Sequence, residues 1–192
     1  LNILEAIRYS GRKEEIKFYQ ASSSEMYGNE PSKIKNEITP FQPSSPYAIA
    51  KLYAHWTVNL YREAYGIHGT SGILFNHESP LRGLEFVTRK ISDGIAKIDS
   101  AIKQGLDPVP IILGNLDAER DWMDAEDAVR VIWQILNLDV PREYVIGTGQ
   151  TNSIRSFLDT GFNYVGIDTE WSGHGLNEKL TWAGHDLVTV SK

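Results

Sequence analysis

The chain has 192 residues, of which 41% are hydrophobic and 23% are charged, as is typical of a globular domain and not of a disordered or fibrous segment. Its formal net charge of −6 provides no basic field for phosphate backbones or anionic lipid, so we expect neither nucleic acid nor a membrane as a partner. The chain contains no cysteine, which excludes disulfides, thiolate metal ligands and a cysteine nucleophile, and which favours a cytoplasmic location.

Helix and strand patterns alternate along most of the chain. Leu1–Ile7 has helical periodicity, Ile16–Ala21 is an apolar strand pattern, and Pro46–Tyr65 is a long helical pattern that starts with proline. Further strands are expected at His68–Phe75, Ile111–Leu113 and Tyr144–Ile146, and further helices at Phe86–Gln104, Asp124–Leu138 and Ser153–Val165. The alternation predicts an α/β fold with a mostly parallel sheet. Beyond Gly166 the pattern weakens, and we expect no defined element there.

Tyr47 and Lys51 lie four residues apart at the start of the long predicted helix, so their side chains emerge on the same face. A free tyrosine has a pKa of about 10, and lowering it by ~3 units for a base at neutral pH costs ~4 kcal/mol. An ammonium group about 4 Å away provides ~4 kcal/mol at an effective dielectric constant of about 20. The pair therefore suits a general base, although the same spacing is common on helices that have no catalytic role.

A serine-rich segment follows the first apolar strand. It contains Ser22, Ser23, Ser24 and Glu25, and in α/β sheets reactive groups lie beyond the carboxyl ends of the strands. An isolated segment of this kind is more often a polar turn. The order of features is more specific: a strand, serines and a glutamate, a long loop, and then Ser-Pro-Tyr at the start of a helix with lysine one turn later.

This order of features resembles the extended short-chain dehydrogenase/reductase family, in which a catalytic Ser or Thr follows a central strand and Tyr-x-x-x-Lys begins the next long helix. The Ser-Ser-Glu triplet that starts at Ser23 is similar to the Thr-Ser-Glu of the GDP-mannose dehydratase branch, and Ser23 keeps the hydroxyl group. Gly72–Gly83, Phe86–Ile91 and Leu113–Trp122 are also similar to that branch. The resemblance implies a Rossmann-like, doubly wound parallel sheet, present here in part, with the start of a smaller substrate-binding region.

The same resemblance implies roles for individual residues. The catalytic residues would be Ser23, Glu25, Tyr47 and Lys51. The NADP site would be lined by Tyr47, Lys51, His77 and Arg82. The nucleotide sugar, GDP-mannose, would be contacted by Ser24, Asn76, Val87, Lys90 and Arg120. We expect no metal, because the remaining histidines, His55 among them, have no metal-ligand spacing and are interpreted as structural or surface residues.

The implied reaction is the 4,6-dehydration of GDP-mannose. Tyr47 would take the proton of the sugar O4 while C4 gives a hydride to NADP⁺, and Glu25 would take the C5 proton as water leaves from C6. Return of the hydride to C6 would give GDP-4-keto-6-deoxymannose. The resemblance also implies a homodimer or homotetramer, formed through the helices at Leu1–Ile7 and Pro46–Tyr65.

The chain begins at Leu1 and lacks the family's glycine-rich turn for the cofactor pyrophosphate, so we expect a fragment. Gly147-Thr148-Gly149 follows a strand, but Asn152 stands at the third glycine position, and we interpret the segment as a turn before a helix capped near Ser153. Residues 1–166 would be the C-terminal part of an NADP-binding domain with interleaved substrate-binding segments, and residues 167–192 a divergent tail. Two alternatives stay open: another nucleotide-sugar dehydratase or epimerase, and a non-catalytic fragment.

Overall fold

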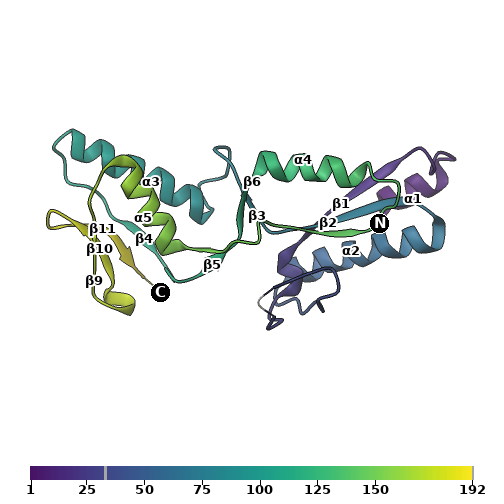
Figure 1. Ribbon diagram of the computed structural model, residues 1–192, viewed down its shortest axis with the longest axis horizontal. Helices are drawn as coiled ribbons and strands as arrows, with labels where there is room; N and C mark the ends of the chain where they lie inside the picture. Colours follow the sequence, from purple (N-terminus) through teal and green to yellow (C-terminus); the bar gives the residue numbers. More distant parts are fainter. Residues whose placement is uncertain (33, 192) are drawn as a thin grey trace. The chain divides into compact units, whose positions relative to one another are not determined.

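The computed structural model describes residues 1–32 and 34–191, and Lys33 and Lys192 lie outside the described residues. The chain divides into two compact units (Figure 1). Unit 1 comprises Leu1–His77 and Trp122–Gly149, and unit 2 comprises Glu78–Asp121 and residues 150–192. None of the described helices combines the length and the apolar content that crossing a bilayer requires.

Unit 1 contains a three-stranded parallel sheet in the order β1-β2-β7. Its elements are α1 (Asn2–Tyr9), β1 (Lys17–Ser23), the 3-10 helix η1 (Ser24–Tyr27), α2 (Pro46–Tyr65), β2 (His68–Leu74), β3 (Asn76–Glu78), β6 (Trp122–Asp124), α4 (Ala125–Leu136) and β7 (Glu143–Ile146). The short strands β3 and β6 pair with each other. The expected α/β fold with a parallel sheet is confirmed, and the long helices lie close to their expected bounds.

Helices cover both faces of this sheet. Adjacent residues of a strand point to opposite faces, and β2 shows this at its end. Ile73 packs in a buried cluster with Leu52 of α2, whereas Leu74 packs in a separate cluster with Ala128 of α4. Because both faces are covered, β2 is buried along almost its whole length. This is the partial, doubly wound arrangement that the sequence predicts.

Local signals fix where α2 begins and how closely it packs. The Ser45 side chain accepts a hydrogen bond from the Ala48 amide at 3.1 Å, and Gly66 ends the helix in the left-handed conformation. On β2, a Cβ atom at Gly69 would lie 2.8 Å from Cγ1 of Val58. Glycine at that position therefore lets α2 approach the sheet, and the first turn of α2 is held in a fixed place.

Unit 2 combines two packed helices with a four-stranded sheet in the order β4-β11-β10-β9. Its elements are α3 (Val87–Lys103), β4 (Ile111–Leu113), β5 (Glu119–Arg120), β8 (Asn152–Ser153), α5 (Ile154–Val165), β9 (Glu170–Ser172), the 3-10 helix η2 (Gly175–Asn177), β10 (Lys179–Trp182) and β11 (His185–Val190). β4 and β11 are parallel, and the other neighbours in the sheet are antiparallel. As expected, the Ser153 side chain caps α5, by accepting from the Ser156 amide at 3.1 Å.

The expectation that no element follows Gly166 is wrong. Three strands form there, and Leu180, Leu187 and Val188 are fully buried. These strands have only three to six residues each and are separated by glycines with positive φ, such as Gly173 and Gly184. Strands this short do not extend over the window that a periodicity argument needs.

Candidate active site

The first group of predicted catalytic residues lies where β1 ends and η1 begins. Ser23 is the last residue of β1, and its Oγ accepts a hydrogen bond from the Glu25 amide at 3.2 Å. Ser24 is half-buried and Glu25 is exposed. Gly28 ends η1 with a φ of 52°, and a Cβ atom there would lie 1.9 Å from the Gln42 carbonyl oxygen, so the turn requires glycine. The serine and the glutamate are thus held together at the carboxyl end of β1.

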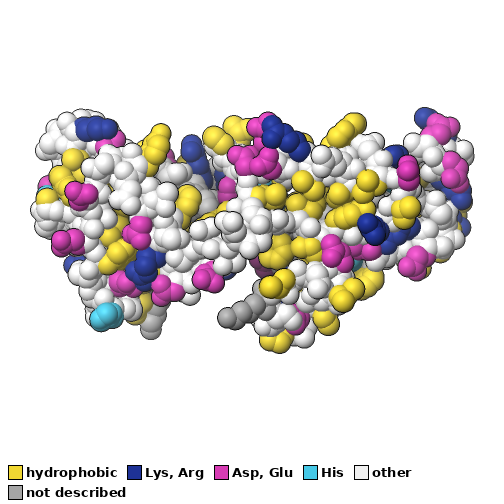
Figure 2. All heavy atoms as spheres, viewed as in Figure 1, with side chains coloured by type: hydrophobic (Ala, Val, Ile, Leu, Met, Phe, Trp, Pro, Cys, Tyr) yellow, Lys and Arg dark blue, Asp and Glu magenta, His cyan; other side chains and the backbone are white. Residues whose placement is uncertain are grey.

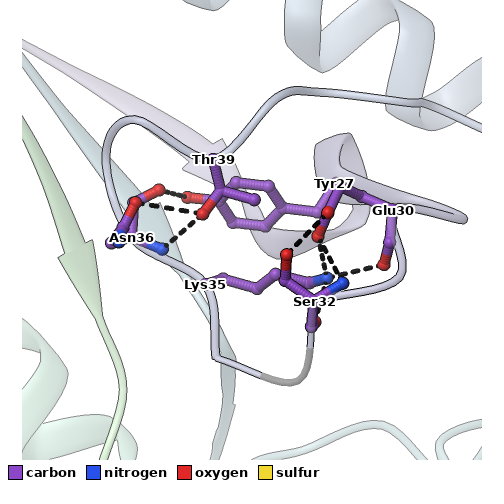
Figure 3. Close-up of polar contacts among 6 residues, drawn as sticks. All are labelled: Tyr27, Glu30, Ser32, Lys35, Asn36 and Thr39. Carbon is purple, nitrogen blue, oxygen red and sulfur yellow. Dashed lines mark hydrogen bonds and ion pairs between the residues drawn. The ribbon is translucent and has the colours of Figure 1, made fainter.

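The loop that leads from η1 to α2 is held by its own polar contacts (Figure 3). The Tyr27 hydroxyl donates to the Asn36 carbonyl at 2.8 Å, and the Asn36 amide donates to Thr39 Oγ1 at 2.9 Å. Lys35 Nζ donates to the Glu30 carbonyl at 2.6 Å and forms an ion pair with the Glu30 carboxylate. The hydrogen bond from Lys35 holds the pKa of Glu30 below its usual value. These contacts hold together the described residues of the loop between the two groups of catalytic candidates.

Tyr47 and Lys51, the second group, lie in the first turns of α2. Lys51 Nζ is 5.6 Å from the centre of the Tyr47 ring, so the predicted pair is brought together. Lys51 Nζ also donates to the Ala21 carbonyl of β1 at 2.9 Å. The Tyr47 side chain is 54% exposed. One ammonium group therefore lies beside the tyrosine ring and links α2 to the strand that carries Ser23.

A buried contact at the same place was not predicted. His55 Nδ1 lies 2.9 Å from Ser22 Oγ, and the two residues are 1% and 3% exposed. The Phe41 ring packs edge-on against His55, with 5.3 Å between the ring centres. The sequence signal that could have found this contact is spacing, because His55 follows Lys51 by four residues on the same helix face.

Burial is the main influence on the protonation state of His55, and two charged groups modify it. Burial lowers the pKa of His55, the positive charge of Arg62 lowers it further, and Glu143 opposes both effects. Arg62 and Glu143 form an ion pair with each other. Burial would raise the pKa of the Glu143 carboxyl, but the hydrogen bond and charge of Arg62, together with a backbone hydrogen bond and the electrostatic effect of His55, hold that pKa below its usual value. His55 is therefore neutral at pH 7.

The remaining predicted site residues are distributed over both units. In unit 1, Asn76 and His77 are half-buried on β3, and His77 Nδ1 lies 3.1 Å from the Phe75 carbonyl oxygen. In unit 2, Arg82 Nε lies 3.3 Å from the Glu78 carboxylate, an ion pair without hydrogen-bond alignment. Among residues 1–32 and 34–191, no group of three or more His, Asp or Glu side chains could hold a metal ion.

The expected substrate contacts Val87, Lys90 and Arg120 also belong to unit 2. Val87 is the first residue of α3, and Phe86 at the N-cap provides no side-chain acceptor for the helix amides. Lys90 Nζ donates to the Ile112 carbonyl at 2.6 Å. Arg120 is exposed on β5 and donates to the Glu119 carbonyl at 2.7 Å. The catalytic candidates thus come from unit 1, and these three contacts come from unit 2.

A parallel sheet covered on both faces, with a serine at the end of β1 and Tyr-x-x-x-Lys at the start of α2, defines a Rossmann-type protein of the short-chain dehydrogenase/reductase class. The family model described as GDP-mannose 4,6 dehydratase matches residues 1–192, and the chain belongs to that family. The match includes residues 167–192.

Curated relatives bear the same name. The chain is 52% identical over 179 residues to the GDP-mannose 4,6-dehydratase of Sinorhizobium fredii (strain HH103), and the match covers 93% of this chain and 50% of the relative. It is 46% identical over 190 residues to the GDP-mannose 4,6 dehydratase of Drosophila melanogaster, with 99% of this chain and 47% of the relative covered. The chain therefore spans about half the length of these relatives.

A solved structure supports the fold. The chain is similar to RMD from Pseudomonas aeruginosa complexed with NADPH, with a TM-score of 0.77 and 22% sequence identity. The similarity covers 99% of this chain and 58% of that chain. At this level of identity the comparison concerns the fold alone, and it confirms the Rossmann-type architecture.

We predict that the stability of the chain falls as the pH drops below about 6.5, the usual pKa of histidine. His55 has a lowered pKa in the folded state, so the unfolded chain takes up a proton that the folded chain does not. The loss is at most ~1.4 kcal/mol per pH unit. Urea unfolding of the wild type and of His55→Phe at neutral and mildly acidic pH checks this.

When the pH is lowered, the urea concentration at the unfolding midpoint should fall more for the wild type than for His55→Phe. A variant of exposed His174, His174→Phe, is the control and should behave as the wild type does. Equal losses in the wild type and in His55→Phe would show that His55 is not a source of the pH dependence.

Proposed function

We propose that the protein to which this chain belongs dehydrates GDP-mannose to GDP-4-keto-6-deoxymannose, with a hydride moved internally through NADP. The observation that carries the proposal is Glu25, a carboxylate two residues after Ser23 at the carboxyl end of β1. A reductase or an epimerase needs a base only for the sugar hydroxyl. Elimination of water needs a further base for the C5 proton, and Glu25 provides that carboxylate. Membership of the family supports the same reaction.

Tyr47, Ser23 and Lys51 would act on the sugar O4. The Tyr47 oxygen takes the O4 proton, and the Ser23 hydroxyl donates a hydrogen bond to O4. The Lys51 ammonium group, held near Tyr47 and by the Ala21 carbonyl, places a positive charge beside the ring. NADP, when bound, supplies the acceptor for the C4 hydride and the donor of the hydride for C6.

Glu25 would carry out the elimination. A ketone at C4 makes the C5 proton acidic, and the exposed Glu25 carboxylate takes that proton. The same carboxyl group then gives its proton to the C6 hydroxyl, which leaves as water. The C5–C6 double bond then accepts the hydride at C6 and one proton at C5. The proton added at C5 balances the one that Tyr47 took from O4, so the product is the substrate less one water.

The donors of unit 1 fit the nicotinamide end of the cofactor. Lys51 has two hydrogens besides the one given to Ala21, and together with the Tyr47 hydroxyl they suit the two hydroxyls of a ribose. His77 would complete the set in unit 1. Arg82, which belongs to unit 2, is proposed as a further cofactor residue that would exchange its contact with Glu78 for the cofactor. The similar structure from Pseudomonas aeruginosa is complexed with NADPH, which supports a nicotinamide cofactor. The choice of NADP over NAD is part of the proposal.

The N-terminal end of α3 suits the diphosphate of GDP. Helix amides and the helix dipole attract anions, and Phe86 leaves the amides at this end without a side-chain cap. Lys90 adds a positive charge in the first turn. We assign Val87 and Lys90 to the diphosphate, and the further contacts to the nucleotide sugar to Ser24, Asn76 and Arg120. We also propose a cytoplasmic location, which the absence of cysteine from the 192 residues supports.

A stripe of apolar side chains on α2 favours a homodimer. Ile49, Tyr53, Trp56 and Leu60 recur every three or four residues and are between 53% and 62% exposed. A second copy of the chain would cover this stripe with the same stripe, as a two-fold interface requires. The dimer could pair again to form a homotetramer.

The proposed function predicts the step at which the reaction stops in the Glu25→Gln variant of the intact protein. Glutamine keeps the shape and the hydrogen bonds of Glu25 but cannot accept the C5 proton, so the first hydride transfer should proceed and the elimination should not. In a single turnover of Glu25→Gln, the absorbance of NADPH should rise and remain high. The wild type should show at most a brief rise. Tyr47→Phe is the control, and it should show no rise because the O4 base is absent.

If Glu25→Gln forms the 4-keto-6-deoxy product at the wild-type rate, Glu25 is not the base for elimination. The reaction would then be an epimerisation or a reduction, for which Tyr47 and Lys51 suffice.

For the dimer, we predict that Trp56→Glu lowers the association of the intact protein. The change places a charge in the centre of the proposed apolar interface, which should weaken association by at least ~10-fold. Light scattering at micromolar concentrations measures the change in mass. Trp133→Glu makes the same change on α4, where other hydrophobic side chains are exposed (Figure 2), and should leave the mass unaltered. A monomeric wild type would contradict the proposal.

A further inference from the structure

We propose that the buried contact between Ser22 and His55 positions the catalytic end of β1 against α2. Both residues are then positioning residues for the reaction proposed above, on which this inference rests. Neither touches the sugar or the cofactor, because both are almost completely buried. Their effect passes through their neighbours in the chain.

The neighbours of the two residues are the catalytic candidates. Ser22 directly precedes Ser23 on β1, and His55 lies one turn beyond Lys51 on α2. The 2.9 Å contact between Ser22 Oγ and His55 Nδ1 therefore joins the backbone that carries Ser23 to the helix face that carries Lys51 and Tyr47. A shift of one group relative to the other would have to break this contact.

A second link between the same two elements is weaker. Lys51 Nζ donates to the Ala21 carbonyl at 2.9 Å, but this contact is exposed and lies at the end of a flexible side chain. Water can replace an exposed hydrogen bond, whereas a buried polar group that loses its partner remains unsatisfied. Of these two links, the contact between Ser22 and His55 is therefore the one that holds the distance between the end of β1 and α2.

The surroundings of His55 keep the contact uncharged and enclosed. The rings of Phe41 and Trp56 pack edge-on against it, with 5.3 Å and 5.5 Å between ring centres. Arg62 on α2 and Glu143 on β7 are the charged groups that act on it, with opposite signs. A neutral imidazole and a hydroxyl form a hydrogen bond in either direction, so the contact persists at neutral pH.

Ser71 provides a matched control. It lies on β2 and is fully buried. Because it is two residues from both Gly69 and Ile73, it shares with them the face of the strand that α2 covers. Its Oγ forms no hydrogen bond with any described residue. Ser71→Ala thus removes a hydroxyl of the same type from the same interface without removing a contact between β1 and α2.

The test measures kcat and KM of the intact protein with GDP-mannose. Ser22→Ala and His55→Leu should each lower kcat by about 10- to 100-fold, the range that small errors of position cause, with KM changed little. The double variant should lose no more than the worse single variant, because both remove one contact. His55→Asn, which can place a polar atom near the site of Nδ1, should recover part of kcat. Ser71→Ala should keep the wild-type kcat.

Hydrogen–deuterium exchange tests the same link without activity. The amides of Glu25 and Gly28, which donate within η1, should exchange faster in Ser22→Ala than in the wild type or in Ser71→Ala. Unchanged exchange, additive losses of kcat, or a rise in KM at constant kcat would each overturn the inference. A wild type that converts no GDP-mannose would refute the proposed function instead, and the exchange result would then decide the inference alone.

Discussion

The packing of α2 against the end of β1 is the constraint on which the candidate site depends. Serine and glutamate come from the strand and the turn that follows it, whereas tyrosine and lysine come from the helix, and a long loop separates them in the chain. Gly69 allows the close approach, and the contacts made by Lys51 and His55 fix the helix to the strand. The proposed reaction at neighbouring carbons of one sugar requires both groups to stay in place, and this interface keeps them there.

Local signals were sufficient to predict the main helices and strands of unit 1, although not η1 or the short strands β3 and β6. Proline at the start of α2 and glycine after its end mark its limits. β2 is buried along almost its whole length because helices cover both faces of the sheet. The pair of Tyr47 and Lys51 was predicted for a similar reason, since residues four apart on a helix always share a face. Each of these features depends on residues that are close in the sequence.

The features that were missed depend on distant residues. β4 pairs with β11, which follows it by more than seventy residues, and the strands after Gly166 become recognisable only through that sheet. Ser22 and His55 are ordinary in the sequence, and burial by residues such as Phe41 makes their contact important. The sequence also could not indicate that Lys90 donates to the Ile112 carbonyl.

The central claim is that the intact protein moves a hydride from C4 to C6 of one sugar while Glu25 moves protons at C5 and C6. The most direct measurement uses GDP-mannose that carries deuterium at C4, with the product analysed by nuclear magnetic resonance. The account predicts a 4-keto-6-deoxy sugar with the deuterium at C6. Deuterium that remains at C4 of a sugar with an intact C6 hydroxyl, or that is lost to the solvent, would contradict it.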